Sequence, residues 1–339
     1  MKITYSKPSA DIIQEGADRQ QNDKDLCHRQ LEQTKKLLSA DNRTECVLCN
    51  SPMQGELFNH REIPVIICAI CGHVQTRLQP PPGYPDYEFA QVYPKLSAEQ
   101  YADRKKRIYT PKLEWILNSL ADKGYKHETL AKMQWTEIGA GAGYFLSALE
   151  DARLSNIVGF DADKTLVDIA NTFTAARSTH FGGEISDAID RYPADIYVAF
   201  FVLEHIQNAH LFYQKLRSLP QGTIFIFAVP IFGFSCLLEN VFTDNFARNF
   251  DGVLHTQLYT EQSIDHAMKT AGFEITAKWI FGQDATDLTR LLINNINTKV
   301  SQDLLRHMEK DLISIQDSLQ NCLDKAGLAD QRHILAIKR

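Results

Sequence analysis

A glycine-rich turn between two apolar stretches is the feature that most constrains what this chain can fold into. Residues 135–146 read Trp-Thr-Glu-Ile-Gly-Ala-Gly-Ala-Gly-Tyr-Phe-Leu. The run ending at Ile138 is typical of a short buried strand, and the apolar residues from Tyr144 onward are typical of a helix start. Glycine permits positive φ and close backbone approach, and a helix N-terminus offers N–H donors to a ligand. The pattern therefore predicts a nucleotide-binding α/β unit.

The spacing of the glycines narrows this prediction. The turn has the form G-x-G-x-G, so Tyr144 stands where a dinucleotide-binding fingerprint would place its last glycine. An acidic residue, Glu137, precedes the turn, and Asp161 ends the next apolar run at 156–160. A carboxylate at the tip of this second strand is positioned to accept both hydroxyl groups of a ribose.

The glycine turn, Asp161 and the run 200–205 (Phe-Phe-Val-Leu-Glu-His) resemble, in order, the motifs of class I S-adenosylmethionine (SAM) methyltransferases. The resemblance implies a Rossmann-like α/β fold with a seven-stranded sheet, and SAM as the cofactor. The predicted cofactor-binding residues are Glu137, Gly139, Gly141, Gly143, Asp161, Phe200 and Phe201. The alternative is an α/β nucleotide-binding fold that transfers no methyl group.

The predicted methyltransferase domain covers residues 133–339. Its later strands are expected at 156–161, 178–181, 195–203, 223–229, 273–281 and 333–338, the last one antiparallel as in the family. A long aromatic loop is expected between 230 and 258, where it forms a wall of the acceptor site. Residues 287–325 have apolar positions at spacings of three and four, which predicts a helical insert that could form a lid or a dimer surface.

Two C-x-x-C pairs predict a small zinc-binding domain at residues 45–78. Cys46 and Cys49 are separated by eighteen residues from Cys68 and Cys71, a spacing that fits a zinc ribbon with a closed, structural Zn²⁺ site. Four unliganded thiols or a redox pair are the alternatives, and His60 and His73 are substitute ligands. Metal binding would supply the folding energy of so small a segment.

The segments around this domain carry weaker signals. Residues 1–44 read as a loose leader, up to about residue 16, followed by a thin amphipathic helix. Residues 79–132 read as a proline-rich linker and a helix that begins with a capping box at Ser97. Tyr87 and Tyr93 lie in this linker, where they either anchor it to the domain or reach the acceptor.

Composition excludes some classes of function. The net charge is −6 over 339 residues, which argues against a broad affinity for nucleic acid. No apolar run approaches the length of a membrane span, and the first residues lack the apolar core of a signal peptide. The expected location is cytoplasmic, and the expected partner is a small-molecule acceptor, with a homo-oligomer left open.

Glu204-His205 at the end of the fourth strand is the sharpest candidate for chemistry. A histidine can accept a proton near neutral pH, and an adjacent carboxylate can orient it. The alternative is that the pair caps a helix or shapes the pocket wall. His255, after the aromatic loop, either faces the acceptor or is a hydrogen-bonded structural histidine.

The order of zinc ribbon, linker and SAM domain resembles the sugar C-methyltransferases, which act on nucleotide-linked keto-deoxysugars. The matching features span residues 46–280 and include His255-x-x-x-Tyr259. The resemblance implies that His205 is the base that forms an enolate, with Glu204 as its partner and Tyr87 or Tyr93 assisting. The C-terminus departs from that family, because a helical segment stands where its members carry a large further domain. The alternatives are O-methylation of a glycan or other small acceptor, and a non-catalytic SAM-binding adaptor.

Overall fold

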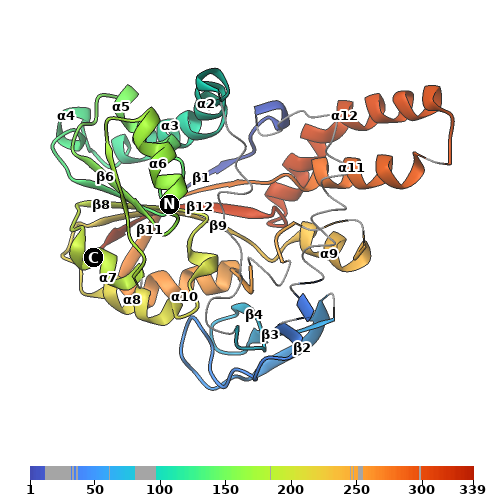
Figure 1. The fold of residues 1–339 in the computed structure, drawn as a ribbon, viewed down its shortest axis with the longest axis horizontal. Helices are drawn as coiled ribbons and strands as arrows, with labels where there is room; N and C mark the ends of the chain where they lie inside the picture. The colour runs from blue at the N-terminus through green and yellow to red at the C-terminus, as the bar shows by residue number, and fades with distance from the viewer. Residues whose placement is uncertain are drawn as a thin grey trace.

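The computed structural model describes residues 1–11, 32, 34–35, 37–60, 62–80, 97–183, 185–244, 246, 248–250, 255–297 and 299–339. Its centre is an eight-stranded sheet (Figure 1). In spatial order its strands are β1 (Lys2–Tyr5), β11 (Phe273–Phe281), β12 (Gln331–Lys338), β9 (Ile224–Pro230), β8 (Ile196–Phe200), β5 (Trp135–Ile138), β6 (Ile157–Asp161) and β7 (Arg177–His180). All neighbours are parallel except β12, which runs antiparallel to both β11 and β9.

The predicted Rossmann-like sheet is therefore confirmed, including its antiparallel last strand. Strand order reverses at β5, with β6 on one side and β8 on the other. The carboxyl ends of the parallel strands flanking such a reversal open a crevice in which α/β proteins bind their ligands. The predicted seven strands are present, and β1 is an eighth.

Strand β1 corrects the interpretation of residues 1–16 as a loose leader. Lys2–Tyr5 pairs in parallel with 277–280 of β11. The Trp279 indole N–H donates to the carbonyl of Ser6 at 3.0 Å, which holds the end of the strand. Four residues are too few to show a strand period in the sequence, and the partner strand lies more than 260 residues away.

Helices cover both faces of the sheet (Figure 1). One face carries α2 (Ala98–Arg104), the π-helical turn Lys105–Tyr109, α3 (Thr110–Ala121), α5 (Tyr144–Asp151) and α6 (Lys164–Phe173), with the short α4 (His127–Leu130) nearby. The other face carries α7 (Ile185–Arg191), α8 (Ala209–Arg217) and α10 (Glu261–Ala271). Two separate apolar clusters fill the two interfaces, as expected for a sheet buried on both faces.

Local capping signals in the sequence are confirmed. Ser97 and Gln100 form the predicted capping box at the start of α2. Thr260 forms a second one with Ser263 at the start of α10, and Gly272 ends that helix in a left-handed conformation.

Two helices near the C-terminus form a hairpin that projects from the sheet (Figure 1). They are α11 (Asp284–Ile296) and α12 (Gln302–Lys325), which account for the predicted helical insert. The predicted aromatic loop at 230–258 is wrong in part, because Phe234–Val241 forms helix α9, which packs against α11. Buried Cys236 and Leu238 give this helix its apolar face.

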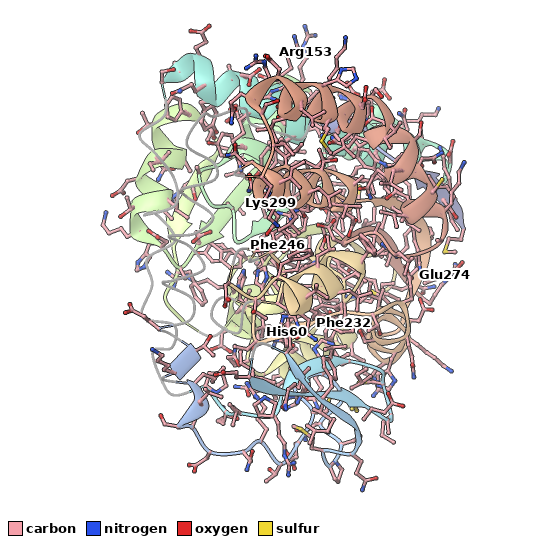
Figure 2. The ribbon with its side chains drawn as sticks, turned by 90° about the vertical axis from the view of Figure 1, so that its right-hand side faces the viewer. His60, Arg153, Phe232, Phe246, Glu274 and Lys299 are labelled. Atoms are coloured by element: carbon pink, nitrogen blue, oxygen red, sulfur yellow. The ribbon has the colours of Figure 1, made fainter. Side chains whose placement is uncertain are left out.

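The predicted zinc ribbon is a four-stranded antiparallel sheet that takes one strand from the methyltransferase part of the chain. Its order is β10 (Gln257–Leu258), β4 (Val74–Thr76), β3 (Ile63–Cys68) and β2 (Gly55–His60). Phe250 and Leu258 complete its apolar cluster. Figure 2 labels Phe232 beside His60 at this junction, and the ring of Phe232 lies 5.5 Å from that of Phe58. Residues 45–78 therefore share their core with the segment that follows β9.

Within the described ranges, none of the helices combines the length and the apolarity that a bilayer crossing requires.

Candidate functional site

The glycine turn forms a tight loop between β5 and α5. Gly139, Gly141 and Gly143 have φ of 67°, 51° and 76°, all in the left-handed region. A Cβ on Gly139 would lie 2.4 Å from Val202 Cγ2, and one on Gly143 would lie 2.8 Å from Ala170 Cβ. A Cβ on Gly141 would meet no atom within 4 Å. The outer two glycines are thus required by packing, whereas Gly141 leaves open space in which a ligand can approach the backbone.

Asp161 fastens the second strand to this loop. One carboxylate oxygen accepts a hydrogen bond from the Gly141 amide at 2.8 Å, and the other accepts one from the Asp163 amide at 2.9 Å. Burial raises the pKa of Asp161, and these amide donors oppose that shift. The side chain is partly exposed, so its remaining lone pairs can reach a ligand at the rim.

Glu137 lies beneath the loop and is almost fully buried. Burial raises its pKa well above the usual range, and the Lys112 ammonium nearby acts in the opposite direction. One of its carboxyl oxygens, Oε2, has no hydrogen-bond partner among the described residues. An unpartnered buried acceptor costs free energy, which a bound ligand with an N–H donor would recover.

The tyrosines predicted to assist the chemistry, Tyr87 and Tyr93, lie outside the described residues. Tyr101, which follows them at the start of α2, does contact the glycine loop. Its hydroxyl donates to the carbonyl of Ala142 at 3.1 Å, and its ring stacks on Tyr144 and Phe173 at centroid distances of 4.4 and 4.2 Å. Helix α2 thereby braces the glycine loop.

The chain turns sharply at the end of β8. Phe201 has a φ of 56°, which is strained for a residue with a large side chain. Its amide donates to the carbonyl of Ala228 at 2.8 Å, which holds the turn. The next residues enter a short 3₁₀ turn, Leu203–His205, and so place Glu204 and His205 at the carboxyl end of the sheet.

A pocket of about 290 Å³ lies at this end of the sheet. Its lining includes Phe201 from the strained turn, His205 and Glu204 from the 3₁₀ turn, and His255 from the segment before β10. The predicted catalytic residues that the structure describes therefore line one cavity. Pro230, at the end of β9, also lines it.

The Glu204 carboxyl group lies near His255, about fifty residues away in the sequence. Its Oε1 is 3.8 Å from His255 Nε2, and the His205 and His255 rings are 4.9 Å apart. The Nδ1 of His255 donates to the carbonyl of Asn249 at 2.7 Å, which directs Nε2 toward Glu204. The prediction paired Glu204 with His205, and the structure adds His255 as the imidazole facing that carboxyl group.

Burial determines the protonation of this pair. It raises the pKa of Glu204 to about 8 and lowers the pKa of His255 to about 4. No described residue donates a hydrogen bond to either carboxyl oxygen of Glu204. At neutral pH the carboxyl group of Glu204 and the imidazole of His255 are thus both uncharged.

Sequence reasoning missed several pocket residues. Lys7 and Lys112 come from distant segments and have no motif around them. Arg248 also lines the pocket, but it forms ion pairs with Asp287 and Asp330 at 3.1 and 3.0 Å, which offset its charge. Only the fold brings residues 7, 112 and 248 to one cavity, so no local pattern could have identified them.

The four predicted metal ligands converge at the base of the small sheet. The Sγ atoms of Cys46 and Cys71 are 3.6 Å apart and those of Cys49 and Cys68 are 3.7 Å apart. Tetrahedral Zn²⁺ with Zn–S bonds of about 2.3 Å requires S···S separations of roughly 3.8 Å. All four sulfur atoms lie within 4.8 Å of one another, so the donor set and its spacing fit Zn²⁺.

The backbone around the thiols supports the same interpretation. Amides of the residues at 48 and 49 point at the Cys46 sulfur, and those at 70 and 71 point at the Cys68 sulfur. Asn50 and Gly72, which follow the two pairs, have φ of 54° and 71°, in the left-handed region that such turns require.

His60 and His73 are not part of the thiol cluster. The Nε2 of His73 donates to the Gln257 side-chain carbonyl at 2.7 Å, and the ring of His60 packs against Phe250. The proposal of substitute ligands therefore does not hold among the described residues.

The small sheet is tied to the pocket by side-chain amides. Gln257 Nε2 donates to the carbonyl of Ile206 at 2.5 Å, and Gln207 Nε2 donates to the Thr256 hydroxyl at 3.1 Å. Arg43 donates to Gln207 at 2.5 Å. These hydrogen bonds connect the small sheet to the residues directly after His205 and directly after His255.

The strand order reverses at β5 and an open glycine loop follows that strand, which is the arrangement expected of a class I SAM-dependent methyltransferase. The chain belongs to the methyltransferase-domain family, whose model matches residues 105–278, just over half of the 339 residues. The prediction of a SAM-dependent methyltransferase is confirmed.

The chain is also similar, at low sequence identity, to several solved structures. Magnesium protoporphyrin IX methyltransferase (ChlM) from Synechocystis PCC 6803 with bound SAH is 11% identical and covers 74% of this chain and 92% of its own, with a TM-score of 0.44. A SAM-dependent methyltransferase from Archaeoglobus fulgidus is 12% identical, with coverage of 66% and 94% and a TM-score of 0.38. No curated protein sequence matches the chain.

Replacing Gly139 with alanine should weaken SAM binding. The added Cβ would lie 2.4 Å from Val202 at a φ of 67°, so the loop and the strained turn must move apart. We expect a loss of about 1–3 kcal/mol in stability and about tenfold or more in affinity for S-adenosylhomocysteine, measured by calorimetry. Gly124→Ala is the matched control, because its φ is 89° but its Cβ would meet no atom. Equal affinities in both variants would contradict the role of Gly139.

Replacing Glu204 with glutamine should stabilise the protein above pH 5. The carboxyl is protonated in the folded state up to a pKa of about 8 but ionises near pH 4.3 when unfolded. Unfolding therefore releases a proton in this window, so native Glu204 lowers stability as pH rises. We expect Glu204→Gln to gain about 1–3 kcal/mol at pH 7–8 and nothing at pH 4, by denaturant unfolding. Glu128→Gln, at an exposed glutamate, should show no difference. A pH-independent gain would refute this explanation.

Proposed function

We propose that this methyltransferase acts on a carbon atom of a nucleotide-linked keto-sugar, with His205 as the base. One observation carries the proposal: His205, His255 and Glu204 lie together in a pocket at the carboxyl end of β8. The resemblance of residues 46–280 to the sugar C-methyltransferases supports the class of acceptor.

For methyl transfer, the protein mainly has to align the acceptor with the methyl group and remove a proton from the acceptor. SAM supplies a methyl group that is already activated on a sulfonium. His205 removes the proton next to the ketone, so that the resulting enolate carbon can attack that methyl group. Glu204 and His255 lie close to His205, where loss of the Glu204 proton could offset the charge that His205 acquires.

The pocket suits a reaction that must exclude water. Its volume lies at the small end of ligand sites in proteins. Phe201 and Phe281 contribute apolar walls, which strengthen the electrostatic effect of the few polar groups inside. A hydroxylated acceptor could lose an O–H proton to His205 in the same way, so O-methylation is the second candidate.

We also propose that Cys46, Cys49, Cys68 and Cys71 bind one structural Zn²⁺. Their four thiolates would fill the coordination shell, so the metal would hold the small sheet together rather than take part in methyl transfer. Its influence on catalysis would be indirect, through Gln257 and β10.

Methyl transfer can be followed with SAM that carries a ¹³C-methyl group and a panel of nucleotide-linked keto-sugars, read by NMR. We expect a carbon-bound methyl signal, and we expect His205→Ala to retain S-adenosylhomocysteine affinity while the rate falls about 10²–10⁴-fold. His307→Ala, at an exposed histidine on α12, is the control and should keep the full rate. An oxygen-bound methyl would exclude the enolate mechanism, and an unchanged rate in His205→Ala would exclude the proposed base.

The metal proposal predicts one zinc per chain after purification without chelator, measured by atomic emission. Cys46→Ser should lose the zinc and melt at a lower temperature, since metal binding contributes folding energy. Cys322→Ser, at an exposed thiol on α12, should keep the wild-type zinc content and melting temperature. Because Gln257 connects the small sheet to Ile206, zinc loss should also slow methyl transfer. Wild-type protein free of zinc, or a Cys46→Ser variant with unchanged metal content, would refute the site.

A further inference from the structure

Two buried lysines form one wall of the pocket, and the reaction as proposed does not use them. Lys7 follows β1 and Lys112 belongs to α3. They are 7% and 5% exposed, and both line the cavity that holds Glu204, His205 and His255. Lysine is rarely buried to this extent unless its charge is compensated.

The Lys112 ammonium is held in place by aromatic rings. Its Nζ lies 4.9 Å from the ring centroids of Tyr109 and Phe200 and 5.0 Å from that of Phe201. Within the described part of the chain, no residue accepts a hydrogen bond from its three N–H groups. The Lys7 ammonium donates to the carbonyl of Arg107 at 2.6 Å, which fixes it on the same side.

The surroundings of Lys112 are positively charged. Burial, together with the charges of Lys7 and Arg104, lowers the pKa of Lys112 to about 7, and the nearby Glu137 only partly opposes this. Burial, together with the positive charges of Lys112 and Lys7, also lowers the pKa of His333 well below its usual range. Grouping like charges in a buried space costs free energy that an anion would recover.

The carboxyl groups that face this wall do not offset its charge. Glu204 and Glu137 have pKa values raised by burial, which favours their neutral forms. Asp330 lines the pocket but is bound by Arg248 at 3.0 Å. The pocket thus combines a neutral acid–imidazole end with a cationic end.

We propose that Lys112, supported by Lys7, binds an oxyanion carried by a ligand of this pocket. The proposal rests on the pocket being the site of methyl transfer and deepens that function by naming an anchoring charge. Two ligands can supply such an oxygen: the carboxylate of the methionine part of SAM, or a phosphate or carboxylate of the acceptor. A lysine supplies a compact point charge with three donors, which suits either group.

The location of Lys112 explains why an anchor here would matter for rate. Phe200 and Phe201, beneath its ammonium, belong to the turn that leads directly to Glu204 and His205. An anion bound by Lys112 is therefore fixed relative to the base, and such positioning is the main demand of methyl transfer.

The test compares Lys112→Met and Lys7→Met with Lys106→Met, which removes an exposed charge from the same helical run. Calorimetry would measure the binding of S-adenosylhomocysteine and of 5′-methylthioadenosine, which lacks the amino-acid carboxylate. Thermal shift would measure stabilisation by inorganic diphosphate against chloride at matched ionic strength. Neither assay needs the acceptor, so failure of the keto-sugar proposal would leave this test intact.

Two results would support the proposal and identify the source of the anion. If Lys112→Met binds S-adenosylhomocysteine at least tenfold more weakly and methylthioadenosine as well as wild type, the anion is the cofactor carboxylate. If cofactor binding is unchanged but stabilisation by diphosphate disappears, the anion belongs to the acceptor. Lys7→Met should show a smaller loss of the same binding or stabilisation. Lys112→Arg, which keeps the positive charge, should retain part of what Lys112→Met loses.

Wild-type behaviour of Lys112→Met in both assays would overturn the proposal. Misfolding cannot imitate the expected result, because the substitution removes a desolvated ammonium and fills the same space with an apolar chain. We therefore expect Lys112→Met to melt at the same temperature as wild type or higher. A marked drop in melting temperature with equal losses for both nucleosides would instead show that Lys112 is structural.

Discussion

The buried side chain of Gln257 holds together the two parts of this enzyme on which the site depends. Its carbonyl accepts from His73 in the small sheet at 2.7 Å, and its amide donates to Ile206 at 2.5 Å, directly after the Glu204–His205 turn. Both of its polar groups are therefore satisfied without water. Because Gln257 also pairs with Gln75 in the β10–β4 ladder, the positions of the thiol cluster, His255 and His205 are mutually fixed.

The second organising constraint is dehydration. Burial raises the pKa of Glu204 and lowers the pKa values of His255, Lys112 and His333 at one end of the sheet. Such a site lowers the stability of the protein, as sites arranged for chemistry often do. It also responds strongly to charge, because a nearby cation lowers the pKa of a buried carboxyl group and a nearby anion raises it.

Much of the fold and part of the site could be predicted from the sequence because their signals are local. The glycine turn, Asp161, the Glu204–His205 pair and the thiol pairs occupy short stretches with fixed spacing. The structure brings the turn, the thiols and the histidines to the places that those patterns indicated. Strand β12 was predictable in position because its apolar run is uninterrupted.

The remaining features depend on contacts between distant segments. Strands β1 and β10 contain four and two residues, so neither shows a period, and each pairs with a strand remote in the sequence. Helix α9 lies in the aromatic stretch that was predicted to be a loop lining the acceptor site. Its packing against α11, which is remote in the sequence, accompanies its helical structure. Lys7 and Lys112 carry no motif, and only the sheet brings them to the same cavity as His205.

The β10–β4 ladder also has a consequence for synthesis. The thiol pairs and β2 to β4 emerge from the ribosome early, but the strand that covers the edge of β4 follows about 180 residues later. At ordinary elongation rates this interval lasts roughly 10–40 s. Throughout it the nascent chain presents an uncovered strand edge, which is a template for pairing with other chains. The period of greatest risk of aggregation therefore precedes completion of the active site, and it ends when residues 257–258 pair with β4.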